Sequence, residues 1–138
     1  MEINYLSVLA CGVFAMVAGF LWYGPLFGNM WLRVIGADAM DMSRRAEMQK
    51  KAMPLYAVQF LLVLFQAYVL AHFIQGWPSA AGTETALWIW AGFVMPTVAA
   101  SSMWNNDSSS VAWTRFLLQA GFQLLCLVAF GFILGYWQ

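Results

Sequence analysis

Four long apolar stretches alternate with short polar segments along the 138-residue chain. They cover residues 5–22, 55–74, 86–103 and 116–137, and none of them contains Asp, Glu, Lys or Arg. Each is close to the ~20 residues that an α-helix needs to cross ~30 Å of hydrocarbon. The pattern therefore predicts an all-α integral membrane protein, a four-transmembrane-helix bundle that forms a single domain over residues 1–138.

The longest polar segment lies between the first and second stretches, over residues 37–53. Ser43 can cap a helix here, and Asp41 and Arg45 are spaced as a favourable i,i+4 pair. We therefore expect a short cytoplasmic interfacial helix between helices one and two, with Pro54 in the first turn of helix two. In helix three, Pro96 predicts a kink because it cannot donate a hydrogen bond to the Gly92 carbonyl.

The basic residues set the expected orientation. Five of the six lie between the first and second stretches and one lies between the third and fourth: Arg33, Arg44, Arg45, Lys50, Lys51 and Arg115. The positive-inside rule places both segments in the cytoplasm, and hence both termini outside it. Only 9% of the chain is charged, and the basic residues are interspersed with acidic ones, so we expect no nucleic-acid binding.

The basic residues of the first connection also suggest a partner. Arg44, Arg45, Lys50 and Lys51 could attract anionic lipid headgroups, each contributing ~1 kcal/mol. The alternative is that they only orient the protein and solvate the connection.

Small residues predict close helix packing in two places. Helix one carries four at successive i+4 positions: Ser7, Cys11, Ala15 and Gly19. This ridge would let another helix approach closely, although a narrow pore lining has the same pattern. Helix four carries Gly131 and Gly135 as a GxxxG pair, for packing within the bundle or between the protomers of an expected homo-oligomer.

Residues that could carry chemistry are few. The chain lacks the HExxH, CxxC, GxSxG and phosphate-binding glycine motifs, and His72 is its one histidine. We therefore expect no catalytic residue, no metal site, no cofactor and no enzymatic activity. No ionisable Asp, Glu, Lys or Arg lies in the apolar stretches, which makes a proton-coupled transporter the third of the functional hypotheses.

The apolar stretches contain four uncharged amide side chains: Gln59, Gln66, Gln119 and Gln123. One interpretation is hydrogen bonding between helices two and four, at ~0.6 kcal/mol on average. The other is a neutral polar cavity that binds a ligand or passes a small solute, with His72 as a further candidate. The leading hypothesis is accordingly a non-enzymatic protein for a small uncharged or amphipathic ligand. The alternative is a structural or accessory membrane subunit.

The turn after helix one is the most distinctive motif of the chain. Residues 19–31 read GFLWYGPLFGNMW, and the expected membrane-interface residues within them are Trp22, Tyr23, Gly24, Pro25, Phe27, Gly28 and Trp31. This motif resembles that of an uncharacterised bacterial membrane family, domain of unknown function seventeen-sixty-one, which runs roughly W-Y-x-P-L-x-F-G-x-x-W. Here the spacing between proline and phenylalanine is one residue shorter, and Gly24 and Asn29 replace the family's frequent Ser and Lys.

Three further stretches are similar to the same family, namely AYVLAH at 67–72, WAGF at 90–93 and AGFQL at 120–124. The resemblance spans essentially the whole chain. It implies a four-helix protein of the bacterial inner (plasma) membrane and supplies no activity.

Overall fold

Helices account for nearly all of the computed structural model, which describes residues 2–105 and 107–137. In chain order the elements are α1 (Tyr5–Leu21), η1 (Trp22–Leu26), α2 (Gly28–Val34), η2 (Ala37–Ala39), α3 (Met42–Gly76), α4 (Gly82–Ile89), η3 (Trp90–Val94), α5 (Met95–Met103) and α6 (Ser109–Tyr136). The segments η1 and η3 are π-helical turns, and η2 is a 3-10 turn. No strand is present in the described residues.

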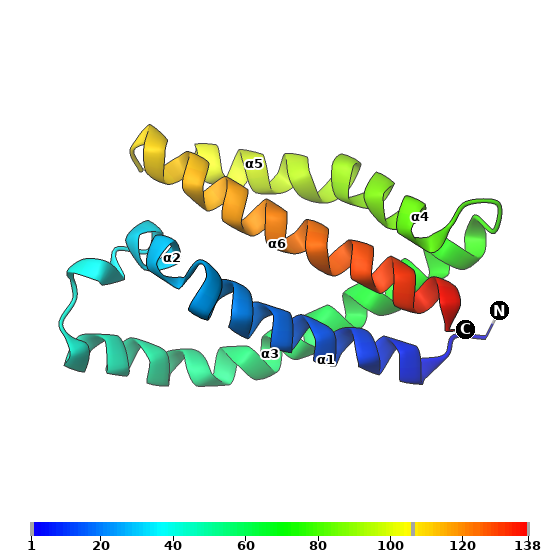
Figure 1. Ribbon diagram of the computed structural model, residues 1–138, viewed down its shortest axis with the longest axis horizontal. Coiled ribbons are helices and arrows are strands. Elements are labelled where there is room, and N and C mark those ends of the chain that lie inside the picture. The colour runs from blue at the N-terminus through cyan, green and yellow to red at the C-terminus, as the bar shows by residue number, and fades with distance from the viewer. Residues whose placement is uncertain (1, 106, 138) are drawn as a thin grey trace.

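Four helical rods are long and apolar enough to cross a membrane: Tyr5–Leu26, Met42–Gly76, Gly82–Met103 and Ser109–Tyr136. Each overlaps one of the four apolar stretches of the sequence. Successive rods run in opposite directions, so the two ends of the chain and the α3–α4 connection lie together at one end of the bundle (Figure 1). The other end holds α2 and the α5–α6 connection.

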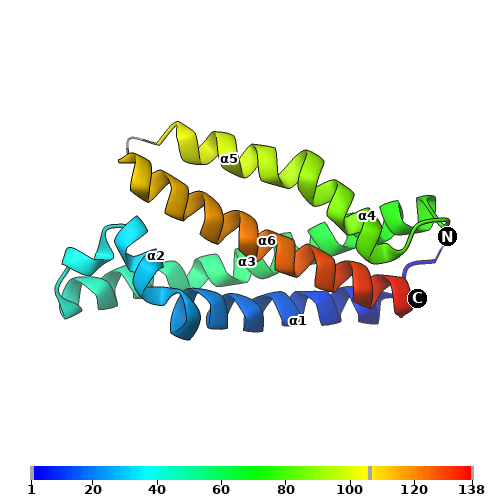
Figure 2. The ribbon, with the colours of Figure 1, turned by 45° about the horizontal axis from the view of Figure 1, so that its top comes forward.

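The central helix of the bundle is α6. It lies between α1 on one flank and the rod formed by α4, η3 and α5 on the other (Figures 1 and 2). Helix α3 crosses the bundle and contacts α1, α6 and α4. Every other rod therefore packs against α6, which makes α6 the element that positions the rest.

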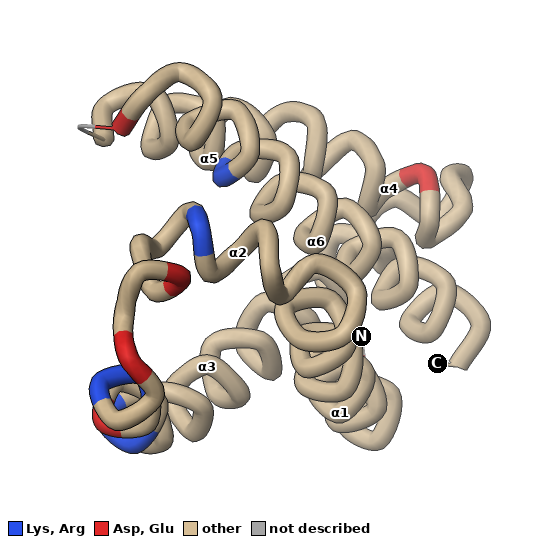
Figure 3. The backbone as a smooth tube through the Cα atoms, turned by 60° about the vertical axis from the view of Figure 1, so that its left-hand side comes forward, with Lys and Arg blue, Asp and Glu red and all other residues tan. Residues whose placement is uncertain are grey.

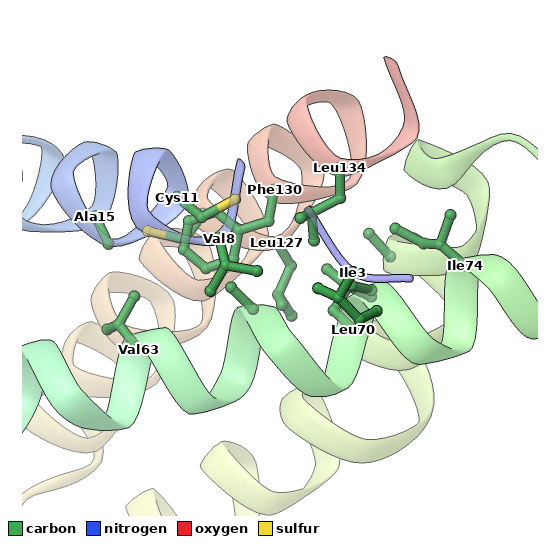
Figure 4. Close-up of a cluster of buried hydrophobic side chains, with 14 residues drawn as sticks. Ile3, Val8, Cys11, Ala15, Val63, Leu70, Ile74, Leu127, Phe130 and Leu134 are labelled. Atoms are coloured by element: carbon green, nitrogen blue, oxygen red, sulfur yellow. The ribbon is translucent and has the colours of Figure 1, made fainter. Parts of the chain in front are cut away.

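The buried core lies in the half of the bundle that holds the chain ends. Its largest side chains come from α6, and α1 and α3 close it from either side (Figure 4). Its members include Val8, Cys11, Leu70, Leu127, Phe130 and Leu134. No described α3 residue before Val63 is buried, so the first part of α3 extends away from this core.

The helix expected over residues 37–53 is not separate from the second span, and the separate short helix between the first and second spans is α2 instead. A single helix, α3, runs from Met42 to Gly76 without a break, and its N-cap is Asp41, which accepts a hydrogen bond from the Arg44 N–H at 2.8 Å. Pro54 lies inside this helix rather than in its first turn. A proline is tolerated there because Lys50, whose carbonyl loses its hydrogen bond, is exposed together with Pro54.

Both π-turns lie beside prolines. Pro25 is inside η1, and Pro96 follows η3 at the start of α5. A proline removes one backbone donor and crowds the preceding turn, and a widened turn relieves that crowding. Where the sequence predicted a kink in the third rod, the structure contains a π-turn that ends just before Pro96.

The closest helix crossing brings glycines of α4 and α6 together. A methyl group added to Gly131 would collide with the Gly82 carbonyl and lie 3.0 Å from the Ala86 Cβ. Gly135 lies against the same glycine, since a methyl group added to it would lie 3.4 Å from the Gly82 Cα. The GxxxG pair of α6 therefore packs within the chain.

Basic side chains are confined to one end of the bundle. Figure 3 shows the Lys and Arg positions on α2, at the start of α3 and at the start of α6, all at the end opposite the chain termini. Arg115 of α6 connects to α2, since its Nη2 lies 3.0 Å from the Asp107 carboxylate and 3.3 Å from the Val34 carbonyl oxygen. The charged ends of α2 and α6 are thereby held together.

Candidate functional site

A groove of about 470 Å³ lies between α3 and the rod of α4 and η3. Ile89 and Phe93 line it from that rod, and Leu127 lines it from α6. Its long wall is one stripe of α3, formed by Gln59, Leu62, Val63, Phe65, Gln66, Val69, Leu70 and Phe73. We call this cavity the α3 groove.

The helical spacing of the sequence explains the α3 wall. Gln59, Gln66 and Phe73 are seven residues apart, and seven residues are close to two helical turns, so all three fall on one face. Gln59 is exposed and Gln66 is half-buried. Both amides therefore face a cavity rather than a packed core.

The other two candidate amides lie elsewhere. Gln119 and Gln123 are half-buried on α6 and do not line the α3 groove. Among the hydrogen bonds of the described residues, none joins any two of the four amides. The structure thus brings two of the four together in one cavity, and it does not show the pairing of helices two and four that the alternative interpretation required.

His72 lies outside the α3 groove. Its side chain is exposed, and its ring meets that of Tyr68 edge-on at 4.7 Å between centroids. Tyr68 in turn stacks on Tyr5 of α1 at 6.4 Å. In the described part of the chain, no three His, Cys, Asp or Glu side chains gather as a possible metal site.

A second cavity, of about 670 Å³, lies along the opposite flank of α6. Phe14 and Trp22 line it from α1 and η1, Thr83 lines it from α4, and the remaining wall is α6 between Gly121 and Ile133. Apart from Thr83 and the Trp22 indole, its lining side chains are hydrocarbon or glycine. It therefore offers apolar contact but little hydrogen bonding.

The turn motif folds into an aromatic cluster. The Trp22 ring lies 4.7 Å from that of Phe27, and the Tyr23 ring lies 4.9 Å from that of Trp31. Gly28 is needed for the close return of the chain, because a Cβ there would lie 3.1 Å from the Tyr23 carbonyl oxygen. The remaining motif residues, Gly24 and Pro25, are exposed.

The small-residue ridge of α1 faces the bundle. Ser7, Cys11 and Ala15 are buried, and a methyl group added to Gly19 would lie 3.4 Å from the Phe122 ring. Helix α1 makes its contacts with α3 and α6. The ridge lies at a packed interface and does not line either described cavity.

The four candidate headgroup residues differ in their surroundings. Arg45 donates to the Ala37 carbonyl oxygen at 2.8 Å and to the Asp38 carbonyl oxygen at 3.1 Å, so it closes the η2 turn. Arg44, Lys50 and Lys51 are exposed on the first turns of α3.

Sequence reasoning missed the role of Trp90. It begins η3, as Trp22 begins η1, and its Nε1–H donates to the Ala120 carbonyl oxygen at 2.9 Å. Trp22 donates in the same way to the Leu118 carbonyl oxygen at 3.1 Å. The signal in the sequence was a repeated W-x-G, at residues 22–24 and 90–92, close before a proline in both cases.

The lining of the α3 groove is apolar apart from its two neutral amides. The lining of the α3 groove includes no titratable side chain, so general acid–base or nucleophilic steps have no candidate there. It offers apolar contact along its length and two amides, each able to donate and accept hydrogen bonds.

Comparison with known proteins yields one match. The sequence model of a family described as "Protein of unknown function (DUF1761)" matches residues 6–135. No curated protein and no solved structure was found to match the chain. The matched range includes the turn motif, both π-turns and the whole α3 groove.

Proposed function

The chain belongs to the DUF1761 family of proteins of unknown function, and from this premise we propose that it is a multi-pass protein of the bacterial inner membrane that binds a small uncharged or amphipathic ligand in the α3 groove. The ligand is bound non-covalently, and the protein is not an enzyme. The same groove would also serve a transport function if the bound ligand moves along it.

The insertion proposed here follows the four apolar rods. Thirty-five residues make α3 about 52 Å long, against ~30 Å of hydrocarbon, so its first turns project beyond the bilayer on the basic side. That side is the cytoplasm, with both termini outside it. Helix α2 then lies at the cytoplasmic interface, and Arg44, Lys50 and Lys51 lie near anionic headgroups.

The observation that carries the proposal is a pair of amides in an otherwise apolar groove. An amide in hydrocarbon without a partner costs several kcal/mol, and the side chains of Gln59 and Gln66 make no hydrogen bond within the described chain. A bound molecule with neutral polar groups would offset that cost. A volume of about 470 Å³ is within the usual range for small-molecule sites.

Recovery of bound ligand tests the proposal. The protein is purified in a mild detergent, and the molecules that it retains are extracted and quantified by mass spectrometry. We expect a defined species at a reproducible ratio in the native chain, reduced at least about tenfold in the double variant Gln59→Leu, Gln66→Leu.

The chain supplies a matched control. Gln119→Leu with Gln123→Leu removes two amides from α6 without touching the α3 groove, so retention should stay at the native value. Equal retention by both double variants, or none by the native chain, would exclude the α3 groove as the site.

The accessory-subunit alternative loses one of its supports. The GxxxG glycines that could have joined two chains are already packed against Gly82 of the same chain. A homo-oligomer remains part of the proposal, but it requires a surface other than this glycine crossing.

A further inference from the structure

We infer that the ligand of the α3 groove is a neutral single-chain amphiphile, extended along α3 with its polar head at Gln59 and its chain directed toward Phe73. The inference rests on the proposed function and adds the class and orientation of the ligand. Three features of the groove support it: its length, its lack of charge and the uneven distribution of its polar groups.

The length of the groove indicates an extended molecule. From Gln59 to Phe73 the α3 wall rises through fourteen residues, about 21 Å at 1.5 Å each. One leaflet accounts for only about 15 Å of the ~30 Å hydrocarbon core. A volume of about 470 Å³ spread over that length leaves a narrow channel, which suits a single chain better than a compact ring system.

The lining sets the charge of the head. Because no Asp, Glu, Lys, Arg or His lines the α3 groove, a phosphate, carboxylate or ammonium would enter without a counter-charge. An amide pairs equally well with hydroxyl, ester or carbonyl oxygens. The head is therefore uncharged and contains oxygen.

The positions of the amides set the direction. Gln59 lies toward the basic end of α3, and Gln66 lies about 10 Å further along the helix. Beyond Gln66 the wall continues only with Val69, Leu70 and Phe73. Several oxygens in line would therefore meet the amides first, and the hydrocarbon chain would occupy the remaining apolar length.

A photo-reactive monopalmitoylglycerol with a diazirine in its acyl chain tests the inference on the full-length protein in detergent micelles. Labelled residues are mapped by mass spectrometry, and unlabelled competitors are added. We expect labelling on α3 around Val69 to Phe73. Monobutanoylglycerol, cholesterol and a lysophosphatidic acid of the same chain length should each compete at least about tenfold less well than unlabelled monopalmitoylglycerol.

One substitution distinguishes binding of the acyl chain from binding of the polar head. Val69→Trp fills the apolar part of the α3 groove, so it should abolish labelling by the long-chain probe while monobutanoylglycerol with a diazirine in its short chain still labels near Gln59. Leu61→Trp, at an exposed α3 position outside the groove lining, is the control and should change neither.

The outcomes distinguish the inference from the proposed function. Equal competition by butanoyl, sterol or phosphate-bearing compounds would overturn the neutral single-chain class while leaving the α3 groove as a binding site. Labelling near Gln59 by the acyl-chain diazirine would overturn the direction. No competable labelling of the α3 groove by any probe, together with unchanged ligand recovery in the Gln59→Leu, Gln66→Leu variant, would overturn both.

Discussion

Two tryptophan side chains attach the flanking rods to the central helix. Trp22 and Trp90 each begin a π-turn, and each indole donates to a carbonyl oxygen of α6, at Leu118 and Ala120 respectively. A π-turn inserts one extra residue, which rotates the following side chains relative to a regular helix. Phe93, three residues after Trp90 in the same π-turn, lines the α3 groove.

Replacing Trp90 with Phe should lower the free energy of unfolding by about 1 kcal/mol, because the Nε1–H donor is lost while an aromatic ring remains. Thermal unfolding in detergent, followed by near-ultraviolet circular dichroism, measures the change. Trp88→Phe is the control, since that ring lies in the same rod and is 64% exposed. Equal effects of the two substitutions would show that the indole bond contributes nothing specific.

At the scale of elements, the crossing of α4 and α6 depends on the absence of side chains. Gly82 and Gly131 meet backbone to backbone, which shortens the distance between the helices and lets Ala86 pack beside them. Glycine lowers helix propensity by up to ~1 kcal/mol relative to alanine. The close packing of the two helices offsets that cost, and a larger residue at either glycine would prevent it.

Gly131→Ala is accordingly expected to lower the free energy of unfolding by about 1–3 kcal/mol through overpacking, despite the better helix propensity of alanine. Gly92→Ala is the matched control, because a Cβ at Gly92 would meet nothing within 4 Å and its stability should be unchanged or raised. Thermal unfolding of the two variants in the same detergent gives the comparison. A stable Gly131→Ala protein would mean that the crossing can open.

The sequence predicted the rods better than their details. The length of the apolar stretches alone located all four rods, because uninterrupted apolar runs of about 20 residues are typical of membrane-spanning helices. It did not predict that α3 continues through Pro54, because the sequence alone does not show that Lys50, whose carbonyl Pro54 leaves without its helical partner, is exposed. It also grouped four amides by residue type, whereas the rotation of α6 relative to α3 places Gln119 and Gln123 outside the α3 groove.

At the scale of the whole molecule, the buried core and the basic side chains lie at opposite ends of the long axis. The end with the chain termini contains the buried core, and the opposite end contains all the basic side chains (Figures 3 and 4). The α3 groove extends between the two. A ligand in it would have its head toward the basic end, at the depth where α3 begins to leave the bundle.

The proposed orientation of this axis can be tested with two single cysteines. Ser109→Cys lies at the start of α6, at the basic end, and Ser79→Cys lies in the α3–α4 connection at the other end; both positions are exposed. A membrane-impermeant maleimide should label Ser79→Cys in spheroplasts and Ser109→Cys only in inverted vesicles. The native Cys11 and Cys126 are buried and provide the unlabelled background. The reverse pattern would place the basic end outside and contradict the positive-inside argument, whereas labelling of both positions from one side would contradict a four-span threading.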